Sequence, residues 1–200
     1  LLESTAHTTM TTSKQDILLI GVGVMGQGIA QVAAQAGHRV FLFDTFEGAA
    51  VKAREKIAAT FTKLIEKAKL TQADADATLA RLVPIQTLAE GKTAMLAIEA
   101  VIERLDVKHS QFQQLEDLLP EGAILATNTS SISVTAIGAG LKRPERLVGM
   151  HFFNPAPLMK LVEVVHGLRT DKGVASEVEA LSRAWGKTPV HTRSTPGFIV

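Results

Sequence analysis

The chain has 200 residues, of which 46% are hydrophobic and 20% charged, and its formal net charge is +1. This composition is that of an ordinary globular protein with a sizeable core, and the charge gives no reason to expect nucleic acid or an anionic membrane as a partner. The chain has no cysteine, which excludes disulfides and thiolate chemistry. No apolar run approaches the roughly 18 residues of a membrane span, so we expect a cytoplasmic protein.

The first residues do not look like part of a folded domain. Residues 1–13 are rich in Ser and Thr and lack the basic and then apolar order of a secretory signal. We expect a disordered leader or an expression remnant there, with Met10 as a candidate natural start, and one α/β domain over residues 14–200.

The first predicted strand, 17–20, runs into a glycine-rich turn and then an alanine-rich helix at 29–36. Gly21, Gly23 and Gly26 have the G-x-G-x-x-G spacing of a dinucleotide-binding loop. In that motif the first glycine permits the turn, the second lets backbone N–H groups approach a pyrophosphate, and the third lets the helix pack on the strand. The helix N-terminus then faces the phosphates with its free N–H groups. A glycine-rich turn of another kind is the alternative.

The second predicted strand, 39–43, ends at Asp44. A carboxylate about 20 residues beyond the loop can accept hydrogen bonds from both ribose hydroxyls of an adenosine. The same charge repels a 2′-phosphate, and no arginine follows closely, so the sequence favours NAD over NADP. A solvated aspartate at a strand end is the alternative for Asp44 taken alone.

A long amphipathic helix is predicted at 47–70, and Thr71 is a candidate cap for another helix that ends near residue 82. This length is unusual for a crossover, so we expect a long helical excursion after the second strand. Its lysines either reach an anionic ligand or face solvent, and both interpretations stay open.

The rest of the chain alternates strands and helices, which indicates a Rossmann-type doubly wound, mostly parallel sheet. Further strands are predicted at 84–86, 94–100, 123–126, 146–150, 161–165 and 187–190. Asn128 and Ser130 belong to a polar cluster just after one of these strands, where ligands of such sheets bind. The last residues, 195–200, look like the start of a further element.

An alcohol dehydrogenase needs a group that takes the hydroxyl proton, and histidine titrates near neutrality. His151 follows a predicted strand and precedes a proline-stiffened turn, while Glu163 interrupts the next aliphatic strand. A buried carboxylate is costly unless it is paired, and a His–Glu pair would also stabilise the imidazolium. Asn154 and Ser130 are candidate hydrogen-bonding groups for a substrate oxygen or the nicotinamide. A packing histidine is the alternative for His151 alone.

The other histidines of the domain are expected to face solvent from caps, helix surfaces or loops; they are His38, His109, His166 and His191. No cluster has the spacing of metal ligands, and hydride transfer needs no metal, so we expect no metal site.

Five segments resemble the 3-hydroxyacyl-CoA dehydrogenase family and occur in the same order: 21–30, 99–103, 128–131, 151–155 and 195–200. The His-Phe-Phe-Asn-Pro of 151–155 is specific to the family. The resemblance implies that His151 is the general base with Glu163 as its partner, and that Ser130 and Asn154 hold the 3-oxygen and the nicotinamide. The NAD site that it implies consists of Gly21, Gly23, Met25, Gly26, Asp44, Glu103, Lys108, Asn128, Ser130 and Asn154. It further implies that Thr60 and Lys67 contact coenzyme A.

The family continues past Phe-Ile-Val with Asn-Arg and an all-helical domain that closes over the substrate and forms the dimer. This C-terminal all-α domain is absent from the sequence, so we expect poor activity from these residues alone and a homodimer for a longer chain. Segments 127–133, 154–168 and 185–190 look most like the phenylacetate-degradation branch, which acts on 3-hydroxyadipyl-CoA; 3-hydroxybutyryl-CoA is the other substrate considered. The rival hypotheses are another β-hydroxyacid dehydrogenase with a lysine base, and an NAD-binding protein without catalysis.

Overall fold

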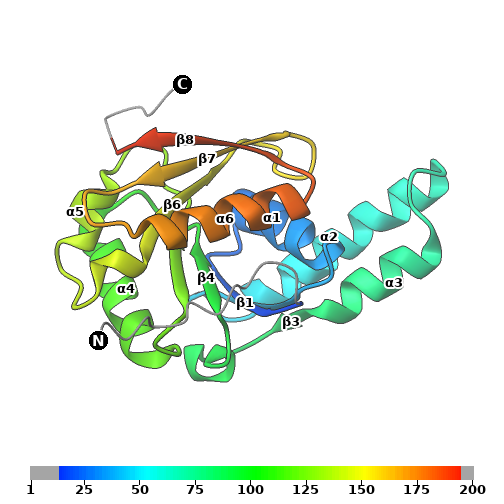
Figure 1. Ribbon diagram of the computed structural model, residues 1–200. Coiled ribbons are helices and arrows are strands. Elements are labelled where there is room, and N and C mark those ends of the chain that lie inside the picture. The colour runs from blue at the N-terminus through cyan, green and yellow to red at the C-terminus, as the bar shows by residue number, and fades with distance from the viewer. Residues whose placement is uncertain (1–13, 195–200) are drawn as a thin grey trace, which may run out of the picture.

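The strands of the described residues, 14–194, form one sheet in the order β3-β2-β1-β4-β5-β6-β7-β8 in the computed structural model (Figure 1). The strands are β1 (Asp16–Ile20), β2 (Arg39–Phe43), β3 (Leu82–Pro84), β4 (Leu96–Glu99), β5 (Ile124–Thr127), β6 (Leu147–Phe152), β7 (Leu161–His166) and β8 (Thr188–Arg193). Neighbouring strands are parallel except β6 and β7, which are antiparallel. The predicted leader and residues 195–200 lie outside the described range.

Helices cover both faces of this sheet. They are α1 (Val24–Gln35), α2 (Ala49–Glu66), α3 (Gln72–Arg81), α4 (Leu105–Leu118), α5 (Val134–Gly138) and α6 (Lys172–Ala184), with 3-10 turns at Leu88–Gly91 and Pro144–Arg146. Helices α2 and α3 lie side by side and project beyond the sheet (Figure 1). Within 14–194, no helix combines the length and apolar character needed to cross a membrane. The predicted Rossmann-type fold with a helical excursion is confirmed.

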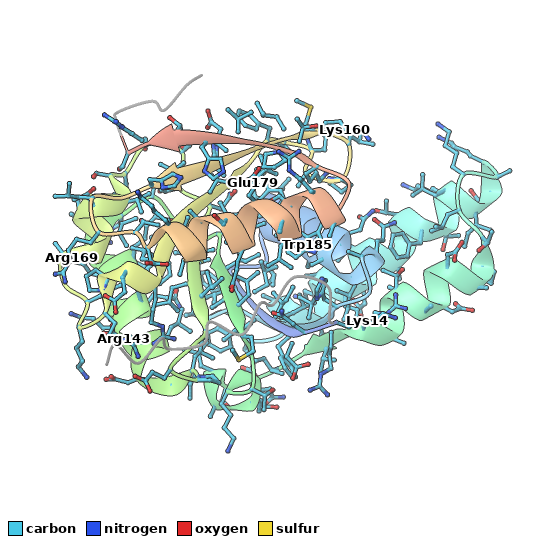
Figure 2. The ribbon with its side chains drawn as sticks, in the orientation of Figure 1. Lys14, Arg143, Lys160, Arg169, Glu179 and Trp185 are labelled. Carbon is cyan, nitrogen blue, oxygen red and sulfur yellow. The ribbon has the colours of Figure 1, made fainter. Side chains whose placement is uncertain are left out.

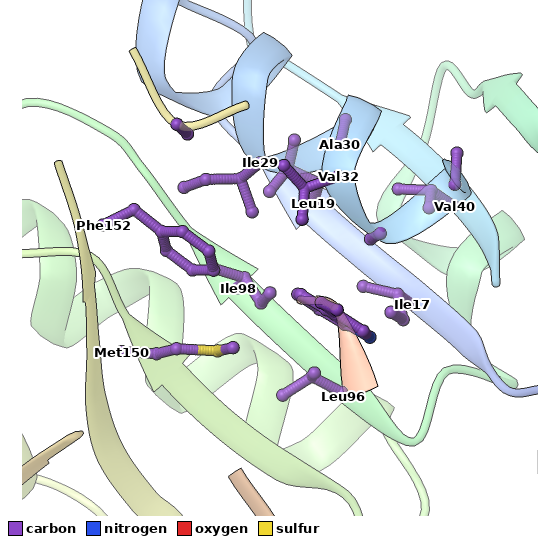
Figure 3. Packing of buried hydrophobic residues seen from close by; sticks show 14 of the residues in the cluster. Ile17, Leu19, Ile29, Ala30, Val32, Val40, Leu96, Ile98, Met150 and Phe152 are labelled. Atoms are coloured by element: carbon purple, nitrogen blue, oxygen red, sulfur yellow. The ribbon is translucent and has the colours of Figure 1, made fainter. Parts of the chain in front are cut away.

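Strand β1 shows why the core has two halves. Ile17 and Leu19 join an apolar cluster under α1 and α6, whereas Leu18 and Ile20 join a second cluster under α4 and α5. Side chains alternate between the faces of a strand, so a strand covered on both faces must be apolar throughout. Figure 3 shows the first half, where Leu19 lies beside Ile29 of α1.

Several predicted boundaries move because sheet pairing and caps decide them. Helix α1 begins at Val24 instead of residue 29, directly after the glycine turn. The predicted strand at 84–86 is wrong: Leu82–Pro84 form it, because this stretch pairs with β2. Antiparallel pairing with β7 extends β6 past residue 150, so His151 lies in the strand and not after it. The predicted cap is confirmed, since the Thr71 hydroxyl accepts the Asp74 N–H at 3.1 Å.

The prediction of solvated histidines is wrong for His38. Its side chain is buried, its Nδ1 accepts the Gln15 N–H at 3.1 Å, and its ring packs edge-on against Trp185 at 5.5 Å (Figure 2 labels Trp185). His191 is exposed and hydrogen-bonds to His166 at 2.7 Å and to Glu179 of α6 at 2.8 Å. Burial lowers the pKa of His38 below its usual range, and burial, followed by the charge of His191, does the same for the pKa of His166.

His109 also departs from the prediction. Its ring is partly buried, and its Nε2 hydrogen-bonds to the backbone carbonyl of Ala136 on α5 at 2.6 Å.

The lowered pKa of His38 predicts a pH-dependent stability. In the unfolded chain this histidine takes up a proton near its ordinary pKa of 6.5, while in the native state burial keeps it neutral. The stabilisation is therefore complete above pH 6.5 and is lost as the pH falls below that value, by at most about 1.4 kcal/mol per pH unit for one proton. We expect His38→Gln to reduce the slope of unfolding free energy between pH 7.5 and 5.5 in urea titrations, leaving a residual slope from His166.

His109→Gln is the matched control, because it also replaces a partly enclosed ring. We expect it to keep more of the wild-type slope than His38→Gln. Equal slopes for wild type and His38→Gln would contradict the assignment to His38.

Candidate active site

The three motif glycines of the loop after β1 meet three different environments. Gly21 has a φ of +87°, and a Cβ there would lie 2.7 Å from the Ala100 carbonyl oxygen. A Cβ at Gly26 would lie 1.8 Å from the Gly21 carbonyl oxygen, so α1 approaches the turn this closely only with glycine. At Gly23 a Cβ would meet no atom within 4 Å. The space before the α1 N-terminus is therefore open, as pyrophosphate binding requires.

Asp44 lies beside this loop because β1 and β2 are neighbouring strands. Its Oδ2 accepts the Val22 N–H at 3.0 Å, and its Oδ1 accepts the Phe46 N–H at 3.0 Å. The carboxylate is partly exposed, as is Met25 in the first turn of α1. The acidic residue and the glycine loop thus form one surface at the carboxyl edge of the sheet.

The order of the strands creates a topological switch point at this edge, which is where the ligand crevice of a doubly wound sheet is expected. From β1 the chain moves through β2 to β3 on one side, and then continues with β4 on the other side of β1. Loops that follow β1 and β4 lead away to opposite sides, and ligands of doubly wound sheets bind at such a point. The glycine loop after β1 and residues 100–104 after β4 flank the crevice.

His151 and Glu163 are directly opposite each other in the antiparallel pair β6–β7. The His151 Nδ1 and the Glu163 Oε2 are 2.8 Å apart, and the side chains are 14% and 1% exposed. A carboxylate accepts, so Nδ1 carries the proton of the neutral ring and the lone pair lies at Nε2. The Phe153 ring packs against the imidazole at 4.6 Å. The pair that the sequence predicts is formed.

Asn128 links the end of β5 to the strand that carries His151. Its side-chain Oδ1 accepts the Phe152 N–H at 2.8 Å. Asn154 lies in the turn after β6 and is exposed. The polar side chains after β5 and β6 thus gather where the two strands end.

Ser130 is exposed, and Glu103 holds it from the neighbouring loop. The Glu103 carboxylate accepts the Ser130 N–H at 2.7 Å and its hydroxyl at 3.2 Å. Burial raises the pKa of Glu103, but the Ser130 N–H and the Lys108 charge outweigh this effect and hold the pKa below its ordinary value. Glu103 is therefore an anion at neutral pH.

Three predicted binding residues lie away from the crevice surface. Lys108 is 1% exposed, and its ammonium lies 2.7 Å from Glu99 and 3.3 Å from Glu103. Thr60 is exposed on the projecting helix α2, where its hydroxyl donates to the Lys56 carbonyl at 3.0 Å, and Lys67 is exposed at the C-cap of the same helix. The structure thus gathers the glycine loop and the residues after β4, β5 and β6 at one edge, and it leaves Thr60 and Lys67 on the part of the chain that projects beyond the sheet, formed by α2 and α3 (Figure 1).

The predicted site does not include Glu99, Thr127 or Gln27. Glu99 ends the apolar strand β4 and is 0% exposed. A single carboxylate in an aliphatic run is the pattern that indicated Glu163, and the same pattern could have indicated Glu99. Thr127 donates its hydroxyl to Glu99. Gln27 braces the glycine loop by donating to the Val22 carbonyl at 2.7 Å, and no pattern in the sequence indicates this.

Fold, glycine loop and Asp44 together define a Rossmann-type dinucleotide-binding domain. Residues 16–195 match the family described as "3-hydroxyacyl-CoA dehydrogenase, NAD binding domain". The chain belongs to this family, which confirms the predicted resemblance and the prediction of NAD as cofactor.

Named relatives agree with this assignment. The chain is 48% identical over 191 residues to 3-hydroxyadipyl-CoA dehydrogenase of Escherichia coli K12, covering 96% of this chain and 40% of the relative. It is 40% identical over 185 residues to a probable 3-hydroxybutyryl-CoA dehydrogenase of Bacillus subtilis 168, covering 92% of this chain and 64% of the relative. The crystal structure of a 3-hydroxybutyryl-CoA dehydrogenase from E. coli has a TM-score of 0.91 at 48% identity, over 94% of this chain and 40% of that one. The chain thus spans 40% to 64% of these relatives.

The contrast between Gly23 and Gly26 predicts two different losses. Gly23→Ala places its methyl group in open space, so we expect a melting temperature close to wild type and an NADH affinity lower by roughly tenfold or more, about 1.4 kcal/mol. Gly26→Ala places its methyl group 1.8 Å from a backbone oxygen, so we expect it to fail to fold or to melt far lower. Thermal melts and NADH fluorescence titrations measure both. Unchanged NADH affinity in Gly23→Ala would show that the dinucleotide does not use this loop.

Proposed function

We propose that this domain serves the NAD-dependent oxidation of a 3-hydroxyacyl-CoA to the 3-oxoacyl-CoA. The observation that carries the proposal is the His151–Glu163 pair, with a 2.8 Å bond, at the edge of the sheet that also carries the glycine loop. The family and the names of the relatives support the same reaction. A dinucleotide alone would not require a buried carboxylate behind a partly exposed histidine.

The roles follow from the directions of the hydrogen bonds. NAD held by the glycine loop and Asp44 would supply the acceptor for the hydride that leaves C3 of the substrate. His151 takes the 3-hydroxyl proton at Nε2, while Nδ1–H stays bonded to Glu163, whose negative charge stabilises the imidazolium. Ser130 and Asn154 orient the 3-oxygen and the nicotinamide carboxamide. In the reverse direction His151 returns the proton to the oxygen.

The His–Glu pair favours this reaction over its two rivals. A β-hydroxyacid dehydrogenase with a lysine base needs a neutral amine that reaches the substrate, and Lys108, the lysine that follows β4, is buried with its side-chain nitrogen against Glu99 and Glu103. A protein that only binds NAD has no use for a paired general base. An activity panel with CoA thioesters and free hydroxy acids separates the three cases.

The substrate that we infer is 3-hydroxyadipyl-CoA, because the E. coli relative at 48% identity carries that name. 3-Hydroxybutyryl-CoA is the alternative, after the B. subtilis relative and the E. coli crystal structure, which is also 48% identical and is named a 3-hydroxybutyryl-CoA dehydrogenase. We assign Thr60 and Lys67 to coenzyme A, since Thr60 is exposed on α2, Lys67 is exposed at the C-cap of α2, and a lysine suits a phosphate. We also propose a homodimer for a longer chain. A higher kcat/KM with the four-carbon acyl chain would reverse the choice of substrate.

The base assignment predicts a selective loss. In full-length enzyme we expect His151→Gln to lower kcat about 10²- to 10⁴-fold, because no group then takes the proton, while NADH affinity stays within about twofold. Stopped-flow or steady-state NADH formation measures the rate. His109→Gln, with its ring bonded to Ala136 of α5, is the control and should retain the wild-type kcat. A near-normal kcat in His151→Gln would mean that another group takes the proton.

A further inference from the structure

A fully buried carboxylate lies one strand away from the glycine loop. Glu99 ends β4 and is 0% exposed. Its Oε2 accepts the Val101 N–H at 3.1 Å, and its two oxygens accept the Lys108 ammonium at 2.7 and 2.9 Å. The Thr127 hydroxyl of β5 donates to the same carboxylate. Each oxygen thus has two donors, and Glu99 is held rigidly.

Lys108 links the Glu99 carboxylate to Glu103, although Lys108 itself is buried and does not reach the crevice surface. Its side chain is 1% exposed, and besides Glu99 its ammonium contacts Glu103 at 3.3 Å. A buried ammonium without a carboxylate is strongly unfavourable, so the position of Lys108 depends on Glu99. Lys108 therefore acts on the site through Glu103.

Glu103 in turn holds the loop after β5 through hydrogen bonds. It accepts the Thr129 hydroxyl at 2.9 Å with both oxygens, and the backbone and hydroxyl of Ser130. The Thr129 hydroxyl oxygen in turn accepts the Ile132 N–H at 3.0 Å. The chain Glu99–Lys108–Glu103 thus fixes the loop after β5, which carries the proposed substrate-binding Ser130.

We propose that Glu99 is a positioning residue of the dehydrogenase reaction: by anchoring Lys108 against Glu103, it sets the orientation of Ser130. This proposal rests on the proposed function. The competing explanation is that Glu99 and Lys108 form a purely structural ion pair. The two differ in one respect: a structural pair matters only through its buried charges, whereas a positioning pair also matters through the hydrogen bond from Lys108 to Glu103.

The test uses Glu99→Gln, Lys108→Met and the double variant in full-length enzyme. Lys108→Met leaves the buried Glu99 carboxylate without a cation, and Glu99→Gln leaves the Lys108 ammonium with Glu103, at 3.3 Å, in place of two carboxylates. We expect both single changes to destabilise the fold, whereas the double variant removes both charges and should fold stably. In the double variant we expect kcat to fall roughly tenfold to a hundredfold, because Ser130 is no longer held in place. Amide hydrogen exchange of residues 128–133 should become faster although the melting temperature stays near wild type. A stable double variant with wild-type kcat and protection would overturn the proposal.

Two further variants complete the test. Thr127→Val removes one donor to Glu99 without changing a charge, and we expect a smaller change in the same direction. Because the Thr127 hydroxyl oxygen also accepts the Thr129 N–H at 3.2 Å, the exchange of Thr129 is left out of this comparison. Arg146→Met removes a buried cation that donates to the Ala123 and Pro120 carbonyls at 2.8 and 2.9 Å, away from Ser130. It should lower stability without accelerating exchange at 128–133 relative to the rest of the chain. Local acceleration in Arg146→Met equal to that of the double variant would contradict the proposal.

The two proposals fail in different ways. If wild-type enzyme oxidises none of the CoA thioesters, the proposed function is wrong, while hydrogen exchange at 128–133 still shows whether Glu99 orders the loop. If wild-type enzyme is active and the double variant equals it, only the role of Glu99 is wrong.

Discussion

The pairing of a buried carboxylate with a histidine across an antiparallel strand pair is the interaction on which the proposed chemistry depends. Glu163 is 1% exposed, and its neighbours in β7 are buried valines, so an unpaired charge there would cost several kcal/mol. The reversal of chain direction between β6 and β7 places His151 opposite it. The requirement of the fold, a partner for Glu163, and the requirement of the reaction, an oriented imidazole, are met by one hydrogen bond.

A buried carboxylate that is paired with a nitrogen-bearing side chain occurs twice at this edge of the sheet, with different consequences. Glu99 in β4 and Glu163 in β7 are both buried, and each binds a group that carries or accepts a proton. His151 is 14% exposed and borders the crevice, whereas Lys108 is 1% exposed and its ammonium contacts Glu99 and Glu103. We therefore assign His151 to proton transfer with the substrate, and we assign Lys108 to holding the binding loops in place.

The sequence predicts those parts of the site that depend on neighbouring residues. The glycine roles follow from backbone geometry within one turn, and the need of Glu163 for a partner follows from its place in an aliphatic strand. Burial of His38 is not predictable in this way, because Gln15 and Trp185, which enclose it, are distant in the chain. Lys108 matches a cofactor-lining position by resemblance, yet only the three-dimensional structure shows that it is enclosed by Glu99. The coenzyme A contacts of Thr60 and Lys67 stay predictions.

The protonation site of the His151 ring tests the central claim most directly. A base at His151 requires a neutral imidazole with its proton on Nδ1, donated to Glu163, and an Nε2 that can take the hydroxyl proton. Nitrogen-15 NMR of histidine-labelled protein, with His151→Gln to assign the resonance, distinguishes the two neutral tautomers. We predict the Nδ1–H form for the neutral ring. A dominant Nε2–H form would contradict the assignment of His151 as the base.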